Sequence, residues 1–304
     1  MLNFITEYFW FFFILGMLSG IFLPLTFLIS PYIIYLLMFV LFLSCLKIDI
    51  VELSKRIKDV KLVAYLTFSV LIISPILFYS IFSYFLEFEY SLAMLLLLVM
   101  PVGIAIPAYT AVFRGDKELS LILSIITSLL CPITIPFLIY VLAGLRASID
   151  YFQVFTMLSI VIFIPFILSS FIKRISGKIV NRTQKYYSAV SIIVMSFVIA
   201  GAISKTDFLQ TISNDKLILY PFILLFLLVG LRHIFGYCLV YRSNNKIRIA
   251  SSLSISHTNS TLAIVVAAEF FSAKTLFLVT LYQIPIAVAL IVFGYIARKY
   301  MVDR

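Results

Sequence analysis

The side chains of this chain that can bind ions or carry protons gather in one polar run near its C-terminal end. Residues 251–261, SSLSISHTNST, place hydroxyl, imidazole and amide groups inside an apolar stretch long enough to span a bilayer. Hydroxyl and amide oxygens are ligands for hard cations. We expect an unwound segment that lines a cavity, because an isolated helix does not expose such groups to lipid. The alternative is the end of a loop at the membrane surface.

Two side chains of this run have distinct possible roles. His257 changes its charge near neutral pH and could carry a proton, or it could be a neutral histidine bonded inside the helix bundle. Asn259 could donate to a substrate or brace neighbouring backbone, and we favour bracing. Ser260 follows directly and completes the polar site.

A second interruption lies earlier in the chain, at residues 100–109, MPVGIAIPAY. Pro101, Gly103 and Pro107 fall within an apolar run over residues 90–113. Proline removes a backbone donor and clashes with the preceding turn, so a straight helix is not expected here. Broken membrane helices at corresponding places in two halves of a chain point to the binding site of a transporter. We expect the two interrupted segments to meet.

A single arginine lies well inside another apolar run. Arg232 is followed by His233, and a charge at membrane depth usually marks a site or a partner. Arg232 could bind a carboxylate in bidentate fashion. It could equally pack between helices against a carbonyl. Glu269, near the end of a later run, is expected at the membrane interface.

The composition places the chain among polytopic α-helical membrane proteins. Hydrophobic residues make up 63%, charged residues 12%, and the mean hydropathy is +1.17, whereas soluble domains carry about 25% charged residues. The net charge of +10 does not indicate nucleic-acid binding, because the basic residues lie at the ends of apolar runs. The membrane lipid is therefore the expected surrounding partner.

Ten apolar runs predict ten transmembrane helices. They cover residues 8–29, 32–46, 62–86, 90–113, 118–143, 151–172, 186–204, 217–241, 247–271 and 275–298. Proline predicts a turn at Ser30–Pro31, a kink at Pro75, and interruptions at Pro132 and Pro136. An amphipathic connector is expected over residues 46–61, and a basic loop over residues 173–185.

The basic residues orient these spans. Eighteen of the 23 Lys and Arg residues fall on one side, and the positive-inside rule makes that side, with both termini, cytoplasmic. We expect one transmembrane domain over residues 1–304 of a multi-pass cell-membrane protein. Five spans in each half invert the second half, which predicts inverted repeats of about residues 1–145 and 146–304. The broken fourth and ninth helices then correspond and cross.

At these residues the chain resembles the bile acid:sodium symporter family, over about residues 31–297. The similarity is clearest in a Pro-x-Gly break, a short basic turn, Leu-Ser and a Pro-x-x-x-Pro pattern. The matching residues are Pro101 and Gly103, Arg114–Gly115–Asp116, Leu119–Ser120, and Pro132 with Pro136. Near the C-terminus, Asn259–Ser260 matches the family's closing Asn-Ser. The resemblance implies an inverted-repeat secondary transporter fold.

The sodium sites of the family are altered in this chain. In sodium-coupled members, side chains of the fourth, fifth and ninth helices hold the cations, including a glutamate. The matching positions are Ile106 and Pro107, Ser120 and Ser124, and Ser254 and Thr258. The hydroxyls can still bind a cation, but the carboxylate that offsets its charge is missing. The resemblance therefore implies at most a weak sodium site at Ser120, Ser124, Ser254 and Thr258.

The sequence favours a secondary transporter of a small organic anion, working by alternating access, with sodium, protons or no ion as the coupling partner. No other cofactor is expected. Its substrate contacts are expected at Pro101, Gly103, Ile106, Pro107, Arg232, His257, Asn259 and Ser260.

Two further readings stay open. An arsenite or auxin-type efflux carrier of related fold would use Cys131, the one thiol near the expected core. An intramembrane enzyme would need a catalytic pair such as Ser254–His257.

Overall fold

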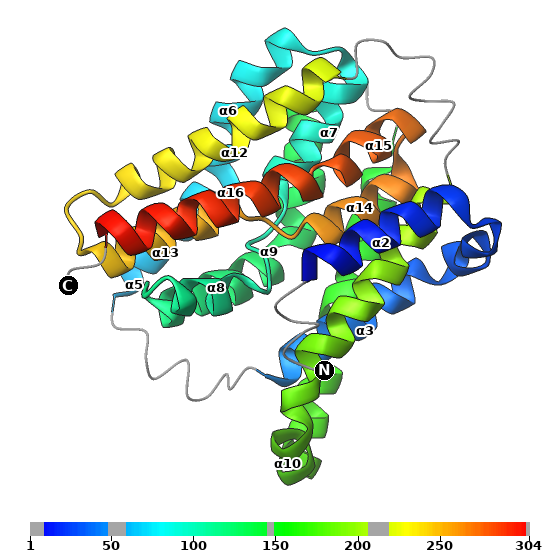
Figure 1. The fold of residues 1–304 in the computed structure, drawn as a ribbon, viewed down its shortest axis with the longest axis horizontal. Helices are drawn as coiled ribbons and strands as arrows, with labels where there is room; N and C mark the ends of the chain where they lie inside the picture. Colours follow the sequence, from blue (N-terminus) through cyan, green and yellow to red (C-terminus); the bar gives the residue numbers. More distant parts are fainter. Residues whose placement is uncertain (1–8, 48–58, 145–148, 206–218, 302–304) are drawn as a thin grey trace.

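The computed structural model describes residues 9–47, 59–144, 149–205 and 219–301, which fold into a bundle of helices (Figure 1). Six of its helical stretches are long and apolar enough to cross a membrane. They are Pro24–Leu46, Val60–Phe85, Lys117–Ala143, Tyr151–Ile203, Leu219–Leu239 and Ala273–Met301. Three shorter apolar helices, Phe11–Phe22, Phe88–Val99 and Ser260–Phe270, lie among them. Most of the predicted amphipathic connector lies outside the described residues.

The chain begins with two helices separated by a tighter one. Helix α2 spans Phe9–Phe22 and α3 spans Ile33–Leu46. Between them the 3-10 helix η1, Pro24–Tyr32, replaces the turn predicted at Ser30–Pro31. The first predicted helix is therefore too long, because Pro24 stands in the first turn of η1 and ends α2.

The third span contains a π-helical turn next to Pro75, the residue at which a kink was predicted. Helices α5, Val60–Phe68, and α6, Ser74–Phe82, are joined by the π-helical turn η2, Ser69–Ile73. Pro75 lies at the start of α6, and the wider turn before it accommodates a residue that has no backbone N–H. The short η3, Ser83–Phe85, closes this span.

The fourth predicted helix is broken, as expected. Helix α7 spans Phe88–Val99 and α8 spans Ile106–Val112. Helix α9 then runs over Lys117–Ala143 without interruption, with the Asp116 carboxylate accepting from backbone N–H groups at its start. The prediction that Pro132 and Pro136 interrupt this helix was wrong, since both residues lie inside it. Neighbouring groups in a membrane bundle can satisfy the backbone that a proline frees.

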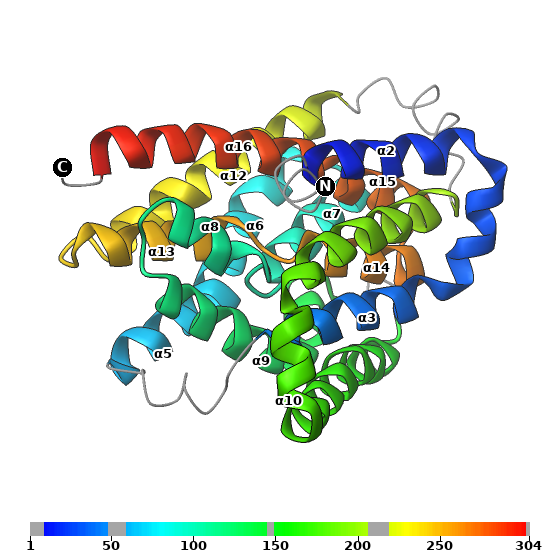
Figure 2. The ribbon, with the colours of Figure 1, turned by 60° about the horizontal axis from the view of Figure 1, so that its bottom comes forward.

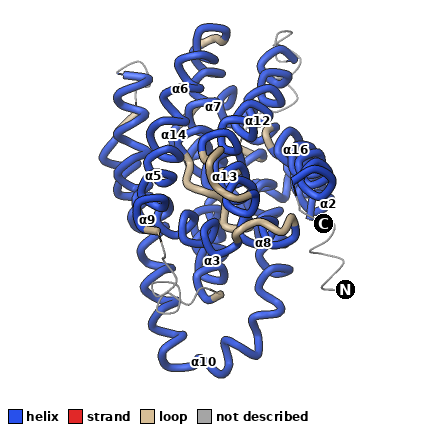
Figure 3. Tube along the Cα trace, turned by 90° about the vertical axis from the view of Figure 1, so that its left-hand side faces the viewer, coloured by secondary structure: helices blue, strands red, loops and turns tan. Residues whose placement is uncertain are grey.

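The predicted basic loop over residues 173–185 was also wrong. Helix α10 covers Tyr151–Ile203, and only Ser176 departs from helical geometry, with φ −124° and ψ 34°. Figure 3 shows α10 as two arms that meet at a bend. The basic residues continue the helix on both sides of Ser176, which is consistent with the high helix propensity of Lys and Arg.

The second half contains the other broken helix. Helix α12, Leu219–Leu239, is followed by α13, Asn245–Ser256, and α14, Ser260–Phe270. The last span consists of α15, Ala273–Leu281, α16, Gln283–Ile296, and the π-helical turn η5, Ala297–Met301. The predicted ninth helix is thus divided at residues 257–259.

Helices α2, α3 and α10 pack together on one side of the molecule, and glycines allow their close approach (Figure 2). A Cβ atom at Gly16 would lie 2.5 Å from the Ser196 carbonyl oxygen, and one at Gly20 would lie 2.7 Å from that of Ala200. Small residues four apart are typical of tight packing between membrane helices. We call α2, η1, α3 and α10 the panel and the remaining helices the core.

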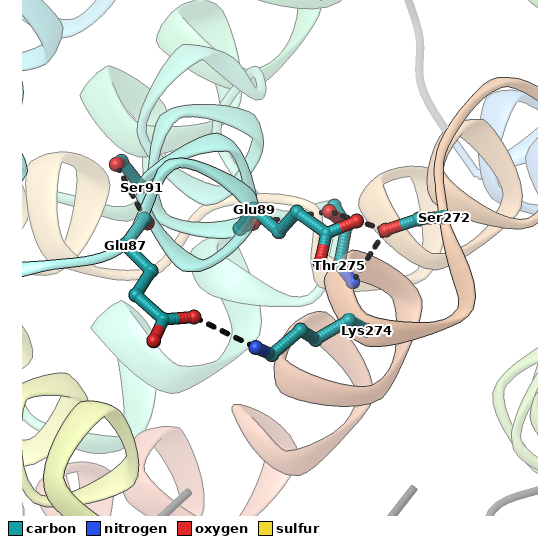
Figure 4. Close-up of polar contacts among 6 residues, drawn as sticks. All are labelled: Glu87, Glu89, Ser91, Ser272, Lys274 and Thr275. Carbon is teal, nitrogen blue, oxygen red and sulfur yellow. Dashed lines mark hydrogen bonds and ion pairs between the residues drawn. The ribbon is translucent and has the colours of Figure 1, made fainter. Parts of the chain in front are cut away.

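Polar contacts hold the N-terminal end of α7 against the start of α15 (Figure 4). The Lys274 ammonium lies 2.7 Å from a carboxylate oxygen of Glu87. The Thr275 hydroxyl donates to the Glu89 carbonyl at 3.0 Å, and the Ser91 hydroxyl donates to the Glu87 carbonyl at 3.0 Å. One half of the first broken helix is thereby attached to the last span.

Candidate functional site

The two breaks meet at the centre of the core. Val102 and Thr258 form an isolated antiparallel β-bridge. The Gly103 N–H donates to the His257 carbonyl at 2.9 Å, and the Asn259 N–H donates to the Pro101 carbonyl at 2.8 Å. Helices α8 and α13 lie together on one side of this crossing, and α7 and α14 on the other (Figures 1 and 2). Backbone groups that the breaks would otherwise leave unpaired in the membrane thus pair with each other.

Gly103 makes the close approach possible. A Cβ atom there would lie 3.2 Å from the His257 carbonyl oxygen and 3.3 Å from that of Thr258. These separations are tighter than ordinary van der Waals contact, so a larger residue would push the two segments apart. Pro101 leaves its own nitrogen without a proton, and its carbonyl is the acceptor for Asn259.

Hydroxyl groups bind the remaining backbone at the crossing. The Val102 N–H donates to the Thr127 hydroxyl at 3.1 Å, and the Ser124 hydroxyl lies 3.4 Å from the Val102 carbonyl. The Thr258 hydroxyl donates to the Leu97 carbonyl at 2.8 Å, near the end of α7. Side chains of α9 and of the second break therefore hold the first break in place.

The four hydroxyls of the expected sodium site have separate contacts. Ser124 and Thr258 donate to backbone carbonyls, and the Ser120 hydroxyl lies 2.9 Å from that of Thr110. The Ser254 hydroxyl is buried and has no partner among the described residues. Their oxygens keep lone pairs for a cation, but no acidic side chain of the described residues contacts them. The carboxylate missing from the sequence is not supplied by another part of the described fold.

Several expected site residues belong to helices rather than to the unwound segments. Ile106 and Pro107 form the first turn of α8, where the missing N–H of a proline costs nothing. Ser251 and Ser254 are helical residues of α13, so the second unwound segment covers only residues 257–259. The expectation that the whole run 251–261 is unwound was therefore wrong.

Asn259 and Ser260 start α14. The Asn259 side-chain oxygen accepts from the Leu262 N–H at 3.1 Å, while its backbone N–H joins the crossing. The Ser260 hydroxyl accepts from the Gln283 side-chain amide at 2.9 Å, which links α14 to α16. Asn259 therefore braces the crossing through its backbone N–H and caps α14 through its side chain. Bracing is the role that the sequence analysis favoured for this residue.

Both histidines of the chain lie together behind the crossing. The Nε2 atoms of His233, on α12, and His257 are 2.9 Å apart. The His233 ring also contacts the hydroxyls of Ser252 and Ser256, and it stacks on Phe293 with ring centroids 4.4 Å apart. The sequence analysis named His257 but missed His233 as its partner. No local pattern joins these two residues, which are 24 positions apart.

Arg232 lies beside this histidine pair and is fully buried. None of its three guanidinium nitrogens has a hydrogen-bond partner of good geometry among the described residues. The Tyr282 hydroxyl lies near the guanidinium, but its own hydrogen bond goes to the Ser256 carbonyl at 3.3 Å. The cation therefore lies among neutral groups, without a carboxylate partner in the part of the chain described.

A cavity of about 50 Å³ opens between the crossing and the panel. It is lined by Pro101, Ile104, Ser124 and Asn259 on the core side. Leu41, Ser44, Cys45, Ile162 and Phe166 line it on the panel side. This space can hold water but not a drug-sized molecule.

Three other candidates from the sequence have contacts that favour no chemistry. The buried Cys131 thiol donates to the Ser128 carbonyl at 3.3 Å. The Ser254 hydroxyl does not bond to His257, so this pair is not a catalytic dyad. Glu269 is partly exposed and pairs with Lys205 at 2.5 Å.

Comparison with known proteins agrees with this architecture. A model of the SBF-like CPA transporter family matches residues 9–301, which include both broken helices. No curated protein sequence matches the chain. The family match confirms the resemblance identified from the sequence, and it makes the protein a multi-pass membrane transporter of a generally non-enzymatic class. With crossed, broken helices at its centre and a match over nearly its whole length, the chain belongs to the SBF-like CPA transporter family.

Proposed function

We propose that this transporter is a secondary carrier of a small organic anion that works by alternating access around the crossing. In this proposal the chain forms ten transmembrane helices as two inverted repeats, about residues 1–145 and 146–304. Both termini are cytoplasmic, because eighteen of the 23 basic residues fall on that side. Sodium or a proton is the coupling ion.

The observation that carries the proposal is the crossing itself. Two helices are broken at corresponding places, and the broken segments pair through Gly103 with His257 and through Asn259 with Pro101. Two of the four half-helices, α8 and α14, begin at this point. Helix N-termini attract negative charge, and α14, with eleven residues, is long enough to offer such an end to an anion.

Arg232 supports an anion as the substrate. A buried guanidinium without a carboxylate partner is costly, and an anionic ligand would offset that cost. Arginine also presents paired N–H groups that fit a carboxylate. The cavity does not reach Arg232 in this conformation, so the proposal requires an open conformation that exposes it.

The moving parts follow from the packing. The panel packs internally through Gly16 and Gly20, and the cavity lies at its boundary with the core. We expect the panel and the core to move against each other, which would open the cavity to either side of the membrane in turn.

Uptake into proteoliposomes tests this function. Purified protein would be reconstituted and supplied with a set of labelled small mono- and dicarboxylates under imposed sodium or proton gradients. We expect gradient-driven accumulation of at least one anion, and Arg232→Gln should reduce it at least ten-fold. Arg248→Gln is the matched control, because Arg248 lies at a helix start and stacks on the Tyr237 ring with 3.8 Å to its centroid. Equal transport by Arg232→Gln would refute the role given to Arg232.

A further inference from the structure

The two histidines of this chain form one hydrogen-bonded unit. His233 and His257 are the only histidines among the 304 residues, and their Nε2 atoms are 2.9 Å apart. His233 belongs to α12, whereas His257 is the first residue of the second break. The His257 carbonyl accepts from the Gly103 N–H, so the imidazole belongs to a residue whose own backbone takes part in the crossing.

The contact of Ser252 with the His233 ring favours one assignment of the ring protons. The Ser252 hydroxyl donates to the His233 carbonyl at 2.9 Å, and the Ser256 hydroxyl donates to the Ser252 carbonyl at 2.7 Å. With these two protons placed on carbonyls, each oxygen can only accept from the His233 ring. The Ser256 oxygen lies 3.2 Å from both Nδ1 and Nε2 and does not distinguish them. The Ser252 oxygen lies 3.0 Å from His233 Nδ1. We therefore assign the His233 proton to Nδ1 on the Ser252 contact, which leaves Nε2 as an acceptor.

This assignment determines the state of His257. Because His233 Nε2 accepts, His257 must donate through its own Nε2–H. A neutral imidazole carries a single N–H, so the His257 Nδ1 atom holds a lone pair. No hydrogen bond to this atom is formed among the described residues. His257 thus presents one open basic nitrogen next to the crossing.

We propose that His257 Nδ1 is the proton site of the carrier, held ready by His233. This inference rests on the function proposed above and names its coupling ion. A hydronium ion gives its proton to the Nδ1 lone pair: one O–H bond breaks, an N–H bond forms, and a water molecule and an imidazolium result. The Nε2–H of His257 still donates to His233 Nε2, and that hydrogen bond becomes charge-assisted. A proton on His233 Nε2 would instead place two donors against each other, so the pair binds one proton.

The surroundings of the pair link this proton to an anion. Arg232 of α12 and Tyr282, between α15 and α16, are the other ionisable groups beside it, and α13 contributes the neutral Ser252 and Ser256. From α16, Phe293 covers the His233 ring. A proton on His257 adds a second positive charge near Arg232. An anion bound there would interact favourably with both charges and would therefore strengthen proton binding. By linkage, the proton would strengthen anion binding by the same factor.

Nitrogen NMR can test the site directly, because only two histidines are present. Full-length protein with ¹⁵N-labelled histidine would be placed in lipid nanodiscs and titrated between about pH 4 and pH 9. We expect one Nδ1–H and one Nε2–H tautomer at high pH, and a ¹⁵N–¹⁵N coupling through the shared hydrogen bond. On acidification one proton should appear on Nδ1 of His257 while that coupling persists. The proposal fails if the coupling is absent, if His233 takes the proton, or if neither ring titrates.

Matched variants separate the proton from the hydrogen bond. His257→Gln keeps an N–H donor for His233 but cannot be protonated, whereas His233→Gln keeps an acceptor for His257. We expect His257→Gln to lose anion accumulation driven by a proton gradient, and His233→Gln to retain more of it than His233→Phe. If the wild-type protein accumulates an anion without responding to a proton gradient, the carrier function stands and the proton site is refuted. If the NMR signature is present but no anion is carried, the proton site stands and the proposed function fails.

Discussion

Replacing Gly103 should loosen the crossing by an amount that grows with the size of the new side chain. A Cβ atom at this position would meet two carbonyl oxygens of the other broken helix, of His257 and Thr258, at 3.2 and 3.3 Å. Its backbone does not lie in the left-handed region, so alanine meets steric conflict alone. Both oxygens belong to a segment that is fixed by its own hydrogen bonds. The new atom must therefore displace backbone rather than a flexible side chain.

The expected cost follows from overpacking a close contact. We expect Gly103→Ala to lower stability by about 1 kcal/mol and Gly103→Val by about 3 kcal/mol. For a chain of this size, 1 kcal/mol shifts the midpoint of thermal unfolding by about 2 °C. Purified variants in one detergent would be compared at one heating rate, because unfolding of such proteins is often irreversible.

Gly230→Ala provides the control. A Cβ atom at Gly230, on the exposed side of α12, would meet nothing within 4 Å, so this variant should be at least as stable as the wild-type protein. If Gly103→Val matched the stability of Gly230→Ala, the two segments would not be in the close contact described, and the argument for the crossing would fail.

Three other substitutions probe separate features. Gly16→Val should lower the stability of the protein by about 3 kcal/mol, because the new side chain would clash with the Ser196 backbone. An unchanged midpoint of thermal unfolding would contradict this packing of the panel. Thr258→Val keeps the shape but leaves the Leu97 carbonyl without its donor, so we expect a loss of about 1 kcal/mol in thermal unfolding, and no loss would show that the bond is dispensable. Pro107→Ala should change stability by less than about 0.5 kcal/mol, because the first turn of α8 needs no N–H there, and a large drop would place Pro107 in the break itself.

The positions of both breaks were accessible from sequence because their causes are local. Pro101 and Gly103 disfavour a helix directly, and the polar run around His257 has no stable place in lipid. The lengths of the breaks were not accessible. Ser251 donates to the Gly236 carbonyl at 2.7 Å, and such bonds allow polar residues to stay helical in α13. Whether a serine finds that partner depends on a neighbouring helix.

The histidine pair shows what the sequence could not provide. His257 was identified by its own chemistry, but its partner lies on another helix and is selected by packing. The same limit applies to the state of Arg232, since the absence of a carboxylate partner becomes visible only when its neighbours are known. Within α10, charge was a poor guide to structure, because lysine and arginine favour helix on either side of Ser176.

The antiparallel bridge between Val102 and Thr258 also fixes the register of the crossing. A slip of one residue would exchange both hydrogen-bond partners and turn the side chains to the opposite face. The two broken helices are therefore held together as one unit, and in the proposed movement of the panel the core wall of the cavity would keep its shape. Under the proposed function, size discrimination among substrates would then be set by the opposite wall, at Leu41, Ser44, Cys45, Ile162 and Phe166.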